Sequence, residues 1–152
     1  MVASRPVAVT RVHALLLCVA LAACTNATTG LQPAAGGMSS AATFGQEFTL
    51  NNGETASFSN DSLQVRFDKV TADDRCPVGA TCVQEGDAVV VVTATRASAT
   101  AQSFELHTKS GLAAEAAYGR YRVRLVKLEP RPVGEQPTPL ASYTATLIVV
   151  TS

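Results

Sequence analysis

The chain of 152 residues carries 12 basic and 12 acidic residues, so its formal net charge is zero, and 47% of its residues are hydrophobic. This balance excludes the strongly basic footprint of a nucleic-acid-binding protein and the basic patch of a protein that binds membranes electrostatically. Length and composition together predict one small globular domain with a single core.

The first 23 residues have the three-part pattern of an export signal. Arg5 and Arg11 lead into an apolar run from Ala14 to Ala20. This run is well short of the roughly 18 residues that a membrane-spanning helix needs, and small residues follow it, as signal peptidases require. We therefore expect residues 1–23 to be removed, which leaves ten basic residues (12 minus Arg5 and Arg11) against 12 acidic ones.

The tetrapeptide Leu21-Ala22-Ala23-Cys24 resembles the lipobox of bacterial lipoproteins, in which the cysteine thiol is acylated before cleavage. The resemblance implies a lipid anchor on Cys24; the alternative is an ordinary secretory signal with an incidental cysteine. Each buried methylene contributes about 0.8 kcal/mol, so more than one acyl chain anchors a protein firmly. Lipoproteins of enteric bacteria that stay in the inner membrane tend to carry Asp after the anchor. Because this chain has Thr25 there, the outer membrane is favoured, with the domain facing the periplasm or the surface.

Residues 24–43 are rich in Ala, Thr, Ser and Gly and contain no charged residue. Such a segment cannot bury a core, so it is predicted to be a flexible tether between the anchor and the domain. The domain itself is expected over residues 44–152.

The domain is predicted to consist of β-strands, because its apolar residues recur with a period of two that a helix cannot use. Val70 breaks the alternation that ends at Phe67, which predicts a bulge near Asp68 and Lys69. The Ala-rich stretch Leu112 to Ala117 is compatible with a single helical turn, but it is too short for such a turn to be stable without packing. About seven strands predict an all-β fold, a single small immunoglobulin-like β-sandwich. The expected strands are at residues 44–50, 54–59, 63–67, 88–95, 103–107, 120–125 and 143–149.

Cysteine usage agrees with export. Of the four cysteines, Cys18 leaves with the signal and Cys24 is taken by the anchor, so Cys76 and Cys82 remain as a pair. We expect them to be bonded, because disulfides persist outside the cytoplasm. Five residues separate them, whereas thioredoxin-like redox pairs are separated by two, which favours a structural bond.

These cysteines belong to the most distinctive motif of the chain, Asp73-Asp74-Arg75-Cys76-Pro77, which is followed by Cys82. Together with Leu-x-x-Leu-x-Pro at residues 125–130 and a final Tyr-led strand, the motif resembles a widespread group of small bacterial lipoproteins with an Asp-x-Arg-Cys-Pro signature. Gln84 stands where that group typically has an aromatic residue. The resemblance brings no known activity with it.

The residues of the motif favour a structural corner. Pro77 and Gly79 allow a tight turn, and Asp74 beside Arg75 is expected to form an ion pair or a backbone cap that pins the loop. The alternative is a calcium site, because hard cations bind several acidic oxygens, although the spacing of an EF-hand is missing. The calcium candidates are Asp73, Asp74, Glu85 and Asp87.

Two further features have a functional and a structural interpretation. His107 is the only histidine of the mature chain, so a zinc site or a serine triad would depend on one imidazole, and a surface strand residue is favoured. Arg120, Arg122 and Arg124 are expected on one strand face, which is a candidate binding face for an anionic glycan or a protein. The alternative is a solvated face whose charges discourage pairing between strand edges.

The sequence therefore predicts a non-catalytic, lipid-anchored protein of the cell envelope that binds a protein or glycan partner or has a structural role. No cofactor, metal or nucleic acid is expected. The alternative is a calcium-binding or enzymatic envelope protein centred on the acidic loop around Cys76 and Cys82.

Overall fold

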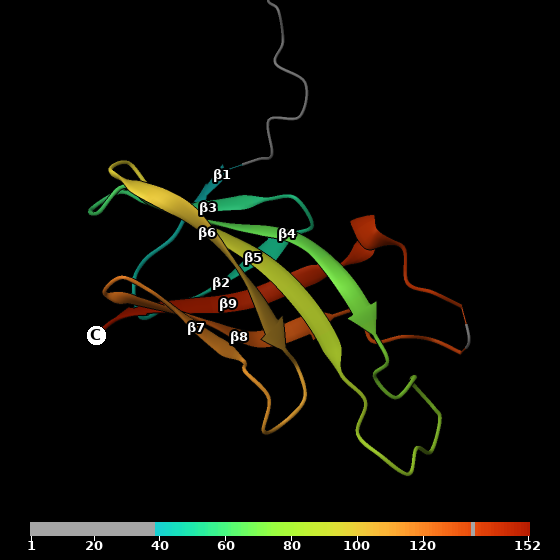
Figure 1. Cartoon of the computed structure of the whole chain (residues 1–152). Helices are drawn as coiled ribbons and strands as arrows, with labels where there is room; N and C mark the ends of the chain where they lie inside the picture. Colours follow the sequence, from blue (N-terminus) through green and yellow to red (C-terminus); the bar gives the residue numbers. More distant parts are fainter. Residues whose placement is uncertain (1–38, 135) are drawn as a thin grey trace, which may run out of the picture. The chain divides into compact units, whose positions relative to one another are not determined.

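The computed structural model describes residues 39–134 and 136–152. They form nine strands in two sheets that pack on each other as a β-sandwich, which confirms the predicted all-β sandwich with nine strands instead of about seven. Figure 1 shows the two layers, with β4, β5 and β6 in one and β7, β8 and β9 in the other.

The first sheet has the strand order β1-β3-β4-β5-β6. Strands β3 to β6 are an antiparallel meander, and β1 adds to β3 in the parallel direction. The bounds are Ser39–Ala41 for β1, Thr55–Phe58 for β3, Leu63–Asp73 for β4, Ala88–Arg96 for β5 and Ala99–His107 for β6.

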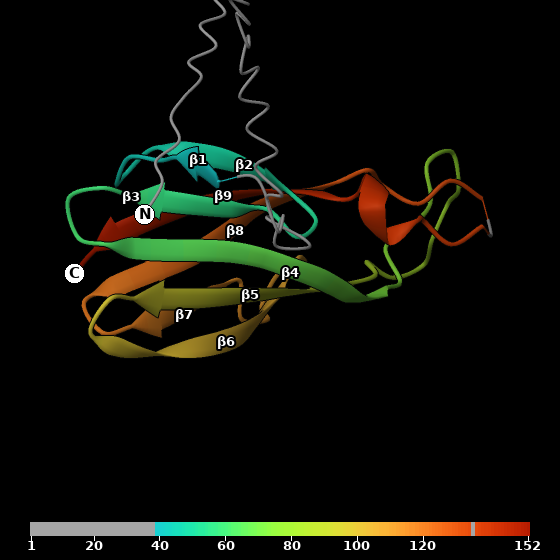
Figure 2. The same ribbon diagram turned by 90° about the horizontal axis from the view of Figure 1, so that it is seen from above.

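The second sheet has the strand order β2-β9-β8-β7, and all its pairs are antiparallel. A short 3-10 helix, η1 (Leu140–Ser142), leads into β9. The meander in each sheet, seen from above in Figure 2, differs from the Greek-key connections of immunoglobulin domains, so the likeness lies in the two-layer architecture. The bounds are Glu47–Asn51 for β2, Glu115–Tyr118 for β7, Tyr121–Glu129 for β8 and Thr144–Thr151 for β9.

Strand β1 lies within the segment 24–43 for which the sequence predicts a tether. The hydroxyl groups of Ser39 and Ser57 are 2.7 Å apart, and the amide of Ala42 donates to the carbonyl of Ser57 at 3.0 Å. Within the described residues, the first strand therefore starts at Ser39, five residues before the predicted start of the domain at Phe44.

Strand β7 occupies part of the Ala-rich stretch that is compatible with a helical turn, so residues 115–118 adopt a strand and not that turn. Glu115–Tyr118 pairs with the start of β8 as a hairpin, and Tyr118 is buried in the core. One isolated helical turn fixes several residues for a single hydrogen bond, whereas the hairpin adds ladder bonds and apolar burial. Tertiary packing therefore decides the conformation of this Ala-rich segment.

The core between the sheets is made by alternating side chains. Leu63, Val65 and Phe67 of β4 are fully buried, as their spacing predicts. The register of β4 against β5 shifts between Phe67 and Lys69, which confirms the predicted bulge, and it shifts again between Val70 and Ala72. These irregularities change which side chains face inward as β4 approaches its end at Asp73.

Candidate functional site

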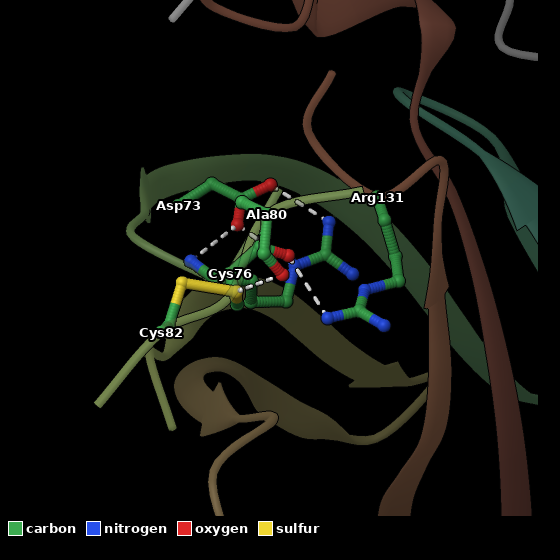
Figure 3. The surroundings of a disulfide bond; sticks show 6 residues. Asp73, Cys76, Ala80, Cys82 and Arg131 are labelled. Atoms are coloured by element: carbon green, nitrogen blue, oxygen red, sulfur yellow. Dashed lines mark hydrogen bonds and ion pairs between the residues drawn. A yellow bond between two sulfur atoms is a disulfide. The ribbon is translucent and has the colours of Figure 1, made fainter. Parts of the chain in front are cut away.

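Cys76 and Cys82 form a disulfide in the connection between β4 and β5, as the sequence predicts. Their Cα atoms are 6.0 Å apart (Figure 3). The turn between them places Gly79 at φ 81°, in the left-handed region that favours glycine, and the amide of Ala80 donates to the carbonyl of Pro77 at 3.1 Å. Pro77 and Gly79 thus make the turn that brings the two cysteines together.

Arg75 holds the base of this loop. Its guanidinium donates to both carboxylate oxygens of Asp73 at 2.7 Å each, and to the backbone carbonyls of Leu128 and Pro130 at 2.6 and 2.7 Å. The two residues are partly buried, and little of either side chain is exposed, 10% for Arg75 and 8% for Asp73. The hydroxyl of Tyr143 also donates to Asp73, at 2.9 Å. We call this group of Asp73, Arg75, Tyr143 and the two carbonyls the Arg75 clamp.

The partner of Arg75 is Asp73 and not Asp74, which corrects the expected ion pair. Burial by itself would raise the pKa of the Asp73 carboxyl, but the hydrogen bonds from Arg75 and Tyr143 and the charge of Arg75 outweigh it, so the pKa lies below its ordinary value. Burial, opposed by a hydrogen bond from Thr138 and supported by the bond to Asp73, raises the pKa of the Tyr143 phenol. At neutral pH the clamp is therefore an ionised pair with a protonated tyrosine as the additional donor.

Two more contacts tie the disulfide loop to the connection between β8 and β9. Arg131 donates from its guanidinium to the carbonyl of Cys76 at 2.9 Å, as Figure 3 shows. The amide of Val78 donates to the carbonyl of Pro132 at 2.9 Å. Because these contacts and the Arg75 clamp join segments more than fifty residues apart, the loop is fixed to the body of the domain.

The return of the loop toward β5 depends on Gly86. A Cβ atom at this position would lie 1.7 Å from the carbonyl oxygen of Asp74, so only glycine fits against that backbone. The amide of Asp74 donates to the carbonyl of Asp87 at 2.7 Å. The backbone of Asp74 is therefore held on both sides.

A pocket of about 580 Å³ lies between the loop and the connection from β8 to β9. Its charged lining residues within the described part of the chain are Asp73, Asp74 and Arg75, of which the first and the last neutralise each other in the clamp. Among the described residues, the carboxylate of Asp74 has no hydrogen bond or ion pair. The lining also includes the side chains of Pro77, Pro132, Gln136, Pro137, Leu140 and Tyr143.

Two of the four candidate calcium ligands, Asp73 and Asp87, hold different parts of the structure. Asp87 accepts hydrogen bonds from Nδ1 of His107 at 2.6 Å and from the amides of Thr108 and Lys109 at 3.0 Å each. Burial would raise the pKa of the Asp87 carboxyl, but these bonds, led by that from His107, lower it overall. Asp87 thus caps the end of β6, while Asp73 belongs to the clamp. In residues 39–134 and 136–152, no group of three or more His, Cys, Asp and Glu side chains is placed to hold a metal ion.

The arginines of the candidate binding face are not equivalent. Arg120 precedes β8, pairs with Asp61 and lies over the ring of Tyr121, 5.3 Å from its centroid. Arg122 and Arg124 are exposed on the outer face of β8, and Arg122 pairs with Glu115 at 2.9 Å. Within the part of the chain that the structure describes, Arg124 alone of the three has no ion pair.

The predicted signal 1–23 and the lipidated Cys24 lie outside the described residues, so the anchor stays a prediction. The described part contains no helix that is long and apolar enough to cross a membrane.

The fold and the loop together define a small β-sandwich protein with a disulfide-closed corner beside a pocket. Comparison of the chain with protein-family models, with curated proteins and with solved structures gives no match. The sequence pointed to the loop through its motif. It gave no signal for Tyr143, Leu140 and Gln136, because they come from a Pro-rich connection and a strand start far along the chain.

Proposed function

We propose that this chain is a non-catalytic, lipid-anchored protein of the cell envelope that binds a partner in the pocket beside the Cys76–Cys82 loop. The single observation that carries the proposal is that the distinctive motif of the sequence builds a wall of this pocket and fixes it through the Arg75 clamp. The partner classes considered are a protein segment and a glycan.

The clamp favours binding because it makes the pocket rigid before any partner arrives. Arg75 and Tyr143 connect the loop after β4 with the two ends of the connection between β8 and β9. A preformed site keeps more of its contact energy as affinity, because less ordering remains to be done on binding. The volume of about 580 Å³ lies in the range of known ligand sites, roughly 300 to 1,000 Å³.

Asp73, which lines the pocket, and His107, the only histidine of the predicted mature chain, already have structural partners. The Asp73 carboxylate accepts from Arg75 and Tyr143, and Nδ1 of His107 bonds to Asp87. A general base or acid must reach a substrate proton, whereas these groups hold loops in place. This use supports a binding role over a catalytic one.

The envelope location rests on the export pattern and on the cysteines. The lipobox-like tetrapeptide ending at Cys24 predicts the anchor, with the outer membrane favoured. The disulfide between Cys76 and Cys82 is of the kind that persists in exported proteins.

Site-specific photo-crosslinking in intact cells tests this proposal. A photoreactive amino acid replaces Gln136, which lines the pocket, or Gln102, an exposed residue of β6 outside it, as the matched control. We expect a discrete adduct of the lipidated protein from position 136 and none from position 102. Absence of an adduct at 136, or the same adducts from both positions, would contradict a partner in the pocket.

A further inference from the structure

We infer that the pocket binds an alkylammonium group, specifically the lysine side chain of a peptide segment. The inference rests on the proposed function and names the chemistry of the partner. Its basis is the charge that the pocket leaves for a ligand, together with the apolar residues around that charge.

The charge available to a ligand is that of Asp74. Asp73 and Arg75 form a buried bidentate pair, and four of the five N–H groups of the guanidinium are donated within the protein. Arg75 is therefore saturated and offers little to an anionic ligand. Asp74 is an exposed residue of the same pocket lining, and its carboxylate has no partner among the described residues, so it offers a ligand a negative charge that no described side chain compensates.

The backbone that carries the Asp74 side chain is fixed in advance, while the side chain itself is exposed. The amide of Asp74 donates a hydrogen bond to the carbonyl of Asp87 at 2.7 Å, and the carbonyl of Asp74 packs directly against Gly86. On the N-terminal side, Asp73 is locked in the clamp. Because this backbone is already ordered, binding of a ligand to Asp74 costs little backbone conformational entropy. This favours a direct charge-assisted hydrogen bond to the carboxylate.

The other walls suit the methylene stem of a lysine. Pro77, Pro132, Pro137 and Leu140 supply apolar surface, while the exposed opening admits an extended peptide. A lysine side chain buries its four methylenes along apolar surface and keeps the ammonium at a polar group. In contrast, the negative charge of Asp74 repels a carboxylate or phosphate ligand.

Titration of the full mature chain in detergent, followed by NMR chemical shifts, tests the inference with Nα-acetyl-lysine methylamide as the probe. We expect saturable shifts of the Asp74 and Tyr143 amides. The norleucine analogue, which keeps the stem and lacks the charge, is expected to bind about tenfold more weakly or worse, since a hydrogen bond between charged groups contributes that much.

The variants complete the test. Asp74→Asn is expected to weaken binding of the lysine probe by about tenfold or more at an unchanged unfolding midpoint, because its carboxylate holds no other group. Glu105→Gln on exposed β6 is the matched control and is expected to bind as the wild type does. Equal binding by the norleucine analogue or by Asp74→Asn, or no saturable shift at all, overturns the inference. If the lysine probe does not bind but the photoreactive residue at position 136 still forms its adduct in cells, this inference is overturned and the proposed function stands. If the probe does not bind and no adduct forms, both are overturned.

Discussion

Two neighbouring aspartates have opposite roles in this protein. Asp73, the last residue of β4, is buried against Arg75 and Tyr143, whereas Asp74 lines the pocket without a partner in the described structure. The sequence alone does not separate them, because the two register shifts of β4 change the inward phase of the strand before its end. A one-residue change of phase exchanges the two faces of a strand. The motif therefore located the corner correctly and assigned the ion pair to the wrong carboxylate.

The variant Asp73→Asn is predicted to lower the free energy of unfolding by about 3 kcal/mol, because it leaves the Arg75 guanidinium buried without its counter-ion. Equilibrium denaturation of the purified protein measures the change. Asp74→Asn is the control and should unfold close to the wild type. Equal effects of the two variants would contradict the clamp.

The Asp73 carboxylate also makes the stability of the protein depend on pH. The pKa of Asp73 is depressed in the folded state, so its contribution is fully present above the unfolded value, about 3.9, and is lost as the pH falls through the folded pKa. Denaturation midpoints between pH 7 and pH 2 should therefore fall more steeply for the wild type than for Asp73→Asn. The depressed pKa of Asp87 leaves some acid dependence in the variant. Parallel curves for the two proteins would show that Asp73 is not the linked group.

At the scale of elements, the period-two pattern of apolar residues predicted the strands well wherever one face of a strand is buried and the other is exposed. Seven of the nine strands follow from alternating residues, including the bulge of β4. The sequence did not predict β1 and β7, which are short and lack a run of alternating large apolar residues, and each pairs with a neighbouring strand. Intrinsic preference is too weak to decide such segments against tertiary packing.

The loop after β4 gives a steric prediction. Gly86→Ala is expected to destabilise the protein strongly, because the new Cβ atom meets the Asp74 carbonyl at 1.7 Å and backbone cannot move aside cheaply. Gly111→Ala is the matched control, since Gly111 has a positive φ of 82° but open space around it. The control measures the conformational cost alone, about 1 to 2 kcal/mol. A smaller loss of stability at Gly86 than at Gly111 would refute the close packing.

Reduction of the Cys76–Cys82 bond is predicted to lower the free energy of unfolding by about 2 kcal/mol, because it closes only a short loop. The circular dichroism of the sheets should survive under native conditions, since typical domain stability is roughly 5 to 15 kcal/mol and the loop keeps its other contacts. A reduction potential measured on the folded protein checks the structural assignment. A value well above about −300 mV would indicate an exchange-active disulfide instead.

At the scale of the whole molecule, the predicted lipid anchor precedes the sandwich in the sequence. The lipid is predicted on Cys24, and 14 residues lie between it and the start of β1 at Ser39. Fully extended, a segment of that length reaches about 50 Å, so it sets an upper limit on the distance between the membrane surface and the edge of the sandwich.

Cys24→Ala is predicted to block acylation, which leaves the precursor uncut or releases a soluble product, because the acylated thiol is both the processing signal and the anchor. Mass spectrometry of the mature N-terminus decides the outcome. A wild-type chain that is unmodified and begins at another residue would refute the lipoprotein assignment.

The corner around Arg75 also implies an order of assembly. The disulfide joins residues that are 6 positions apart, whereas the bonds from Arg75 to Leu128 and from Tyr143 to Asp73 span 53 and 70 positions. The entropy cost of closing a loop rises with its length, and contacts between distant residues form slowly. We therefore expect the cysteines to be oxidised before β8 and β9 have paired, so that the late strands dock against a loop that is already bent. In this order of events, the covalent bond acts as a folding template for the corner, and the Arg75 clamp closes later, when the chain from Leu128 to Tyr143 reaches the bent loop.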